Sequence, residues 1–279
     1  MTASPNAAPP PRQIADDDSA PAAVRRLYAD IRETLDTSIV NLVFRRLAGI
    51  DFEVLEAVWR MLRPAYRSGS IGARAAMVTQ GIAAEIARAA STAPAIRVDN
   101  ASLPTVKALI AGYNQNNARN LIAFAALLGA VPGDPVPTVA GGPSPFEAAT
   151  GTPGIVLPAL PAIEALPDGL ADLVRRLNRF GDTNEPGNPI ASLYLHLTHW
   201  PEVLERAEMT LAPLDADGTL ARWRKAAGDR AAALALPGLA APPDLRGAIE
   251  PVLWSLVGCT LPKMIPIGGL LRALLEDPT

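Results

Sequence analysis

Apolar residues recur every three or four positions along most of the chain, which is the period of one face of a helix. The first such face follows residue 21 and carries Val24, Leu27, Tyr28, Ile31 and Leu35. The same period predicts helices over 37–47, 51–62, 71–90, 170–177, 190–199, 220–234, 245–259 and 261–275, and another from Pro201 onward. Sustained alternation of β-branched residues, the mark of a half-buried strand, is missing. The pattern therefore predicts an all-α fold.

One apolar stretch, 103–130, is interrupted by polar residues. Asn114, Gln115, Asn116 and Asn117 follow one another in its middle. Asparagine is a poor helix former because its amide competes for backbone hydrogen bonds. The cluster is either an exposed turn between two shorter helices or a polar pocket whose amides donate to a carboxylate or a halide. On the sequence alone we favour the turn.

A short passage occurs twice, which indicates an internal repeat. Glu53–Glu56 and Glu202–Glu205 both read Glu-Val-Leu-Glu, and Leu62 falls on Leu211 in the same frame, 149 residues later. Chance or shared helix composition is the alternative explanation. Two related units predict a pseudo-twofold pair of helical repeats, and a pocket often forms where such units meet. The seam is therefore the first place to look for function.

The distribution of proline divides the chain. Residues 1–18 are rich in proline, then acidic, and are predicted to be a disordered tail. Nine prolines lie in 132–167, a density that forbids a continuous helix and predicts a linker. We therefore expect one helical repeat over 19–131 and a second over 168–279.

Composition excludes several classes of function. The 279 residues are 49% hydrophobic, with a formal net charge of −3 and no basic cluster, which argues against a nucleic-acid partner. A single cysteine, Cys259, cannot form an internal disulfide, so a cytoplasmic location is the default. The longest apolar stretches, 121–131 and 253–261, are shorter than the roughly 20 residues of a membrane helix. We predict no membrane association.

Few residues have the spacing of a catalytic or metal site. His196 and His199 share a helix face, but no third metal ligand accompanies them, so we expect one hydrogen-bonded core histidine and one at a helix end. Asp182 and Glu185 lie in a polar loop and are either a general base or solvated acids. Cys259 sits in an apolar run, as a small buried side chain does. The sequence therefore predicts no metal site.

Four stretches of the chain resemble the group I D,L-2-haloacid dehalogenases: Leu27–Leu35, Ala57–Arg60, Tyr113–Asn117 and Trp200–Pro213. The resemblance covers most of the chain. It implies an all-α pseudo-dimer of two repeats with the active site between them, a homodimer, and no metal or organic cofactor. In that family an aspartate activates a water, which displaces halide from a 2-haloalkanoate without a covalent intermediate.

The resemblance assigns pocket positions to this chain. It implies that Asn117 is the family's pocket asparagine and that Ser192 is the serine before the catalytic aspartate. The catalytic aspartate itself falls on Leu193, and a leucine cannot accept a proton. A pocket tyrosine falls on Asn120. Two pocket aromatics fall on aliphatic residues (Ile39 and Leu42).

Whether the protein is an enzyme therefore stays open. If it is one, the resemblance implies a cofactor-independent hydrolase. In that case either Asp182, Glu185 or His196 replaces the missing base, or the pocket carries out a different reaction. Otherwise the fold is kept without hydrolysis, and the protein binds a small ligand such as a short 2-substituted carboxylate, or is a structural helical dimer. A titratable group pointing into a seam pocket beside Asn117 would discriminate between these possibilities.

Overall fold

The computed structural model describes residues 13–16, 18–129, 157–182 and 188–275. The regular elements over these residues are helices, and the only pairing of the β type within them is a single parallel bridge between Ile96 and Leu275. The predicted all-α fold is confirmed.

Eleven α-helices are described: α1 (Ala22–Leu35), α2 (Leu42–Ile50), α3 (Phe52–Arg67), α4 (Ser70–Thr92), α5 (Leu103–Leu127), α6 (Asp168–Arg179), α7 (Ser192–Leu197), α8 (Pro201–Ala216), α9 (Thr219–Ala233), α10 (Pro243–Ser255) and α11 (Leu261–Leu274). A 3-10 turn, η1 (Ile163–Ala165), precedes α6, and a π-helical turn, η2 (Leu256–Thr260), joins α10 to α11.

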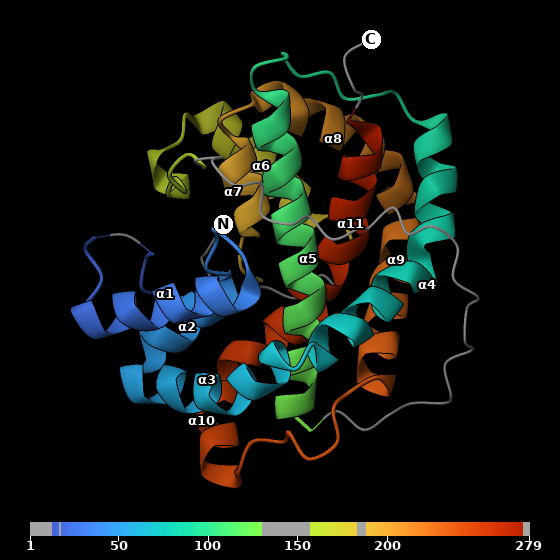
Figure 1. The fold of residues 1–279 in the computed structure, drawn as a ribbon. Coiled ribbons are helices and arrows are strands. Elements are labelled where there is room, and N and C mark those ends of the chain that lie inside the picture. The colour runs from blue at the N-terminus through green and yellow to red at the C-terminus, as the bar shows by residue number, and fades with distance from the viewer. Residues whose placement is uncertain (1–12, 17, 130–156, 183–187, 276–279) are drawn as a thin grey trace, which may run out of the picture.

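The centre of the molecule is the pair α5 and α11. Helix α11 packs against α5, α9 and α4, while α1, α2 and α3 form a group at one side (Figure 1). Both central helices are buried along most of their length, since neither confines its apolar residues to a single face. Each predicted half of the chain thus supplies one core helix.

The interpretation of the amide cluster as a turn is wrong. Helix α5 runs unbroken through it, and Asn114, Asn116 and Asn117 are all buried. Two of these amides bond to other parts of the chain: Asn41 Nδ2 donates to Asn117 Oδ1 at 3.0 Å, and Asn116 Nδ2 donates to Thr37 Oγ1 at 2.8 Å. The amides therefore do not compete with the backbone of their own helix.

Two predicted helices are shorter in the structure. The helix expected over 37–47 begins at Leu42, because the Asn41 side chain caps α2 by accepting a hydrogen bond from the backbone N–H of Val43 at 3.1 Å. The helix expected over 190–199 is limited to α7. Asp51 caps α3, since its Oδ1 accepts from the backbone N–H of Glu53.

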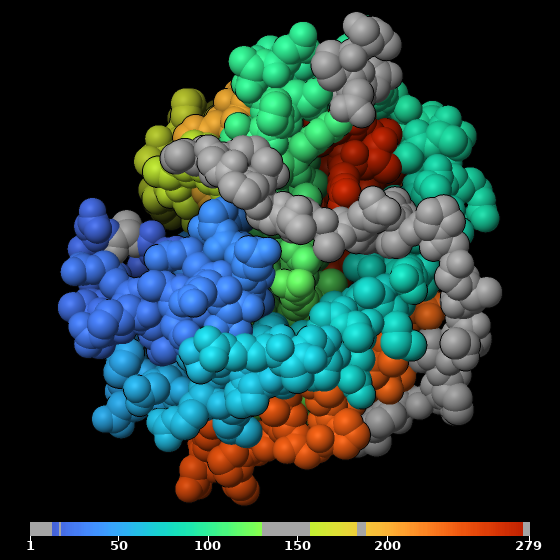
Figure 2. All heavy atoms as spheres, in the orientation of Figure 1, coloured from blue at the N-terminus to red at the C-terminus, as the bar shows by residue number. Residues whose placement is uncertain are grey.

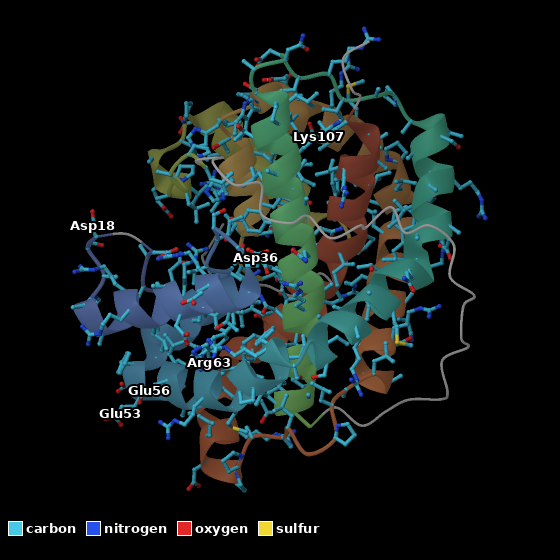
Figure 3. All side chains as sticks on the ribbon, in the orientation of Figure 1. Asp18, Asp36, Glu53, Glu56, Arg63 and Lys107 are labelled. Atoms are coloured by element: carbon cyan, nitrogen blue, oxygen red, sulfur yellow. The ribbon has the colours of Figure 1, made fainter. Side chains whose placement is uncertain are left out.

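The helix bounds repeat at the spacing of the duplicated passage. Helices α3 and α8 both have 16 residues and begin 149 residues apart. The same spacing separates Gly69 from Gly218, which precede the next helices. Both glycines have left-handed backbone conformations, with φ of 75° and 76°. Glu53 and Glu56 lie at the outer edge of the molecule (Figure 3), while Leu55 is buried. The two-repeat organisation stays a prediction that these bounds support.

The predicted tail and linker lie largely outside the described residues. Within the tail, the backbone N–H of Ile14 donates to the carbonyl of Arg45 at 3.0 Å, and the Tyr28 hydroxyl donates to the carbonyl of Ile14 at 3.0 Å. Within the linker, 157–167 contain η1. Residues 13–16 therefore contact the helices that carry the site described below.

One continuous helical stretch, Pro243–Leu274, is long and apolar enough to span a membrane by length and composition alone. The apolar pattern predicted two helices here, over 245–259 and 261–275, so the continuous stretch is longer than predicted. In the structure 78% of its most apolar window is buried inside the molecule, which is typical of a core helix. The stretch is thus weak evidence for a membrane span.

Helices α5 and α11 approach closely at Gly268, where an added Cβ would lie 3.1 Å from Asn114 Oδ1. We expect Gly268→Ala to lower the free energy of unfolding by about 1–3 kcal/mol, because the buried amide has to shift. Gly247→Ala is the control, since its Cβ would meet nothing within 4 Å, and it should leave stability unchanged or raise it by about 1 kcal/mol. Urea denaturation measures both, and equal effects would contradict the close-packing argument.

Candidate functional site

Two cavities adjoin at Tyr113, which lines both of them. The small cavity has a volume of ≈ 20 Å³, room for about one water molecule. The larger has a volume of ≈ 290 Å³, which suits a small ligand. Residues from both predicted halves line each of them, so both lie at the seam.

The small cavity brings together four residues that the family resemblance singled out (Leu42, Asn117, Ser192 and Leu193). Asn117 comes from α5, and Ser192 and Leu193 form the first turn of α7. Asn41 holds the Asn117 amide from the start of α2. The wall opposite α7 includes Thr260 of η2, whose buried hydroxyl has no partner among the described residues.

Leu193 is 1% exposed and supplies an apolar wall where the resemblance implies an aspartate. The described residues around the small cavity include no carboxylate and no histidine. Tyr113 is the one titratable side chain on that wall, and burial raises the pKa of its phenol, so it stays protonated. Among the described residues, the lining of the small cavity therefore combines polar groups that can bind a water with no side chain that can take a proton from it.

A chain of hydrogen bonds leads from the small cavity to the larger one. Arg45 Nη2 donates to Ser192 Oγ at 2.6 Å, Ser192 bonds to the Tyr113 hydroxyl, and Tyr113 Oη lies 2.6 Å from His196 Nδ1. His196 also bonds to the carbonyl of Pro158. Because a carbonyl only accepts, Nε2 of His196 carries the proton and Nδ1 accepts from Tyr113.

His196 is neutral at physiological pH. Burial, followed by the positive charge of Arg45, lowers the pKa of its imidazole to about 4. Both ring nitrogens already have partners, one in Tyr113 and the other in Pro158. His196 is thus a hydrogen-bonded core histidine on the wall of the larger cavity.

Arg45 is the main charge between the two cavities. It is 6% exposed, and burial lowers the pKa of its guanidinium. Its Nη2 donates to the neutral hydroxyl of Ser192, and its Nε has no acceptor among the described residues. Asp16 lines the same cavity but pairs with Arg32. Arg45 is therefore a buried cation without an ion pair within the described part of the chain.

The larger cavity lies where the start of the described chain meets the segment that follows residue 156. Asp16, Ile39 and Val40 line one side, and Leu157 and Leu160 line the other. Figure 2 shows these two parts of the chain, coloured blue and olive, next to each other on one side of the molecule. The lining thus combines apolar side chains with the polar groups of Arg45, Tyr113 and His196.

The remaining predicted site residues lie elsewhere. Asn120 accepts a hydrogen bond from the Tyr66 hydroxyl at 2.7 Å and lines neither cavity. Asp182 pairs with Lys263, which is 1% exposed, and also accepts from Cys259 Sγ at 3.1 Å. Glu185 lies outside the described residues. Asp182 is thus held by a buried cation away from Asn117.

Metal ligands do not gather in the described part of the chain: no three side chains of His, Cys, Asp or Glu come together there. His196 and His199 point to different partners, since His199 Nε2 contacts the carbonyl of Ala159 at 2.9 Å.

Three residues of the site were not predicted from the sequence: Asn41, Arg45 and Tyr113. Tyr113 lies in a stretch that carries the family resemblance, but its role as a hydrogen-bond donor was not predicted. A signal for Arg45 was present. Arg45 and Arg46 are the two charged residues of an otherwise apolar helix. On a surface helix, such a pair would lie on a polar face exposed to solvent. Both arginines are buried instead.

Comparisons with known proteins place this architecture in one structural class. Two solved structures match the fold over nearly their whole length. A D-2-haloacid dehalogenase mutant in complex with D-2-CPA is 16% identical, with 95% of this chain and 99% of that chain covered and a TM-score of 0.64. A D-2-haloacid dehalogenase in complex with L-LA is 15% identical at the same coverage, with a TM-score of 0.58. At this identity the likeness shows the fold.

A sequence family agrees with that fold. The model of the family described as halocarboxylic acid dehydrogenase DehI matches residues 38–151, which include α2 to α5. A search of curated proteins finds no match. The predicted resemblance to the haloacid dehalogenases is therefore confirmed as a likeness, in fold over most of the chain and in sequence over residues 38–151.

The buried ion pair of Asp182 with Lys263 should contribute to the free energy of unfolding. We expect Asp182→Asn to lower the free energy of unfolding by about 3–5 kcal/mol, because it leaves a buried ammonium without its counter-charge. Asp229→Asn is the matched control. Asp229 pairs with Lys225, and the two side chains are 63% and 73% exposed. Loss of this exposed pair should change the free energy of unfolding by less than about 1 kcal/mol. Urea denaturation at neutral pH compares the two. A small effect of Asp182→Asn would mean that Lys263 is solvated.

His196 makes the stability of the fold depend on pH. Its folded pKa of about 4 lies below the unfolded value of 6.5, so the unfolded chain binds the extra proton first. Stability is complete above pH 6.5 and falls as the pH drops toward 4. Relative to His196→Asn, whose Oδ1 still accepts from Tyr113, the wild type should lose about 2–3 kcal/mol between pH 7.5 and pH 4.5. Parallel pH curves for the two proteins would refute the assignment.

Proposed function

We propose that this protein binds a small carboxylate in the seam of a haloacid dehalogenase fold, and does not hydrolyse 2-haloacids through an activated water. The observation that carries the proposal is Leu193, a buried apolar residue on a water-sized cavity whose other walls keep Asn117 and Ser192. The parts that hold a water or a ligand are retained, while the proton acceptor is missing.

General-base catalysis needs an acceptor within hydrogen-bond reach of the attacking water. Asp182 is bound to Lys263, and both nitrogens of His196 are engaged. Neither residue lines the small cavity. Glu185 lies outside the described residues and is the one candidate base that the geometry does not argue against.

Ligand binding is supported by two features. The solved relatives include complexes with D-2-CPA and with L-LA, so this fold holds small molecules. In this chain a cavity of ≈ 290 Å³ adjoins a buried guanidinium, which selects for a negatively charged ligand. The homodimer and the cytoplasmic location that the sequence suggested remain part of the proposal.

Restoring the acid tests the proposal directly. With racemic 2-chloropropionate at pH 7–9, the wild type should release no chloride above background, while Leu193→Asp should release it at least about tenfold faster, because a carboxylate then borders the water-sized cavity. Leu193→Asn is the matched control, since it places a polar side chain of similar size there without a base. Chloride release by the wild type that Leu193→Asn leaves unchanged would mean that a base acts elsewhere and that the protein is a hydrolase.

A further inference from the structure

We propose that Arg45 is the counter-cation of the bound ligand, and that the larger cavity takes a short monocarboxylate whose carboxylate pairs with this guanidinium. The inference rests on the proposed function and locates its ligand. It assigns the ligand to the cavity lined by Arg45, Tyr113 and His196 rather than to the small cavity beside Leu193.

Size decides between the two cavities. The small cavity of ≈ 20 Å³ admits about one water molecule, so a ligand of several heavy atoms does not fit there. The larger cavity of ≈ 290 Å³ accommodates one. Tyr113 separates the two, which leaves the small cavity as a water site next to the ligand.

Charge decides which ligand fits. A buried charge is stable only when it is paired and hydrogen-bonded. Arg45 has five N–H donors; its Nη2 donates to Ser192, and its Nε has no acceptor among the described residues. Asp16 is the acid on this cavity and is engaged by Arg32. A ligand carboxylate would accept two of the remaining donors in the paired geometry that guanidinium favours.

The rest of the wall fits the other end of such a ligand. Ile39, Val40, Leu157 and Leu160 are apolar and surround the cavity. His196 adds no second charge at neutral pH, and its nitrogens are used by Tyr113 and Pro158. Apart from Ser38 and Asp16, whose charge is paired with Arg32, the cavity therefore presents one positive charge beside apolar side chains, which matches one carboxylate with a short hydrocarbon chain and disfavours dianions.

The experiment is isothermal titration calorimetry of the full-length protein at pH 7.5 and low salt, with racemic 2-chloropropionate as the probe. The wild type should bind it, and Arg45→Gln should weaken binding at least tenfold. Arg46→Gln is the matched control: Arg46 is the next residue of α2 and is also buried, but it lines neither cavity. Its affinity should equal that of the wild type.

A neutral isostere and a stability readout separate recognition from a structural role. 2-Chloropropionamide should bind the wild type at least tenfold more weakly than the acid does, a comparison that needs no variant to fold. Without ligand, Arg45→Gln should melt at the same or a higher temperature than the wild type, because it removes an unpaired buried charge. Arg45→Lys, which keeps the charge but loses the planar fork, should show intermediate affinity.

The outcomes are distinct. Loss of binding in Arg45→Gln alone, with a preference for the acid over the amide, supports the assignment. Equal binding of 2-chloropropionate by the wild type and Arg45→Gln overturns it and leaves carboxylate binding standing. Binding of the acid and the amide with equal affinity also overturns it. Failure of the wild type to bind 2-chloropropionate at millimolar concentration refutes this inference, and release of chloride would separately refute the proposed function.

Discussion

The site depends on the side chain of Asn41. Its Oδ1 caps the backbone at the start of α2, while its Nδ2 donates to Asn117 in the middle of α5. One amide thus fixes where α2 begins and how α2 sits against the central helix. Because Arg45 lies one turn into α2, the same amide determines the position of the guanidinium between the two cavities.

That guanidinium links the two halves of the seam. Arg45 of α2 donates to Ser192 at the start of α7, and Ser192 in turn forms a hydrogen bond with Tyr113 of α5. An aspartate at position 193 would place a negative charge one residue from the hydrogen-bond partner of Arg45. Leu193 contributes none. A leucine at this position supplies no proton acceptor and no negative charge beside Arg45, which connects the absence of hydrolysis that we propose to the anion binding that we propose.

Much of the fold was predictable because helical periodicity is local. The period of three and four identified α1, α3, α4 and the helices of the second half from residues close together in the chain. The errors arose where distant contacts decide the outcome. Asparagine's poor helix propensity argued for a turn at 114–117, but hydrogen bonds to Asn41 and Thr37, more than 70 residues away in sequence, outweigh it. Family resemblance identified Asn117, Ser192 and Leu193, whereas the partners of Arg45 and Asp182 could not be read from sequence spacing.

The two proposed repeats treat their buried polar groups in opposite ways. In the frame that relates α3 to α8, Lys263 of α11 takes the place of Asn114 of α5, and both side chains are almost fully buried. Lys263 is neutralised inside the protein by Asp182. In the first repeat, Arg45 lines the larger cavity, and its Nε has no acceptor among the described residues. The ion pair of Lys263 leaves no charge for a ligand, whereas Arg45 has no such partner among the described residues, so the binding that we propose belongs in the first half of the seam.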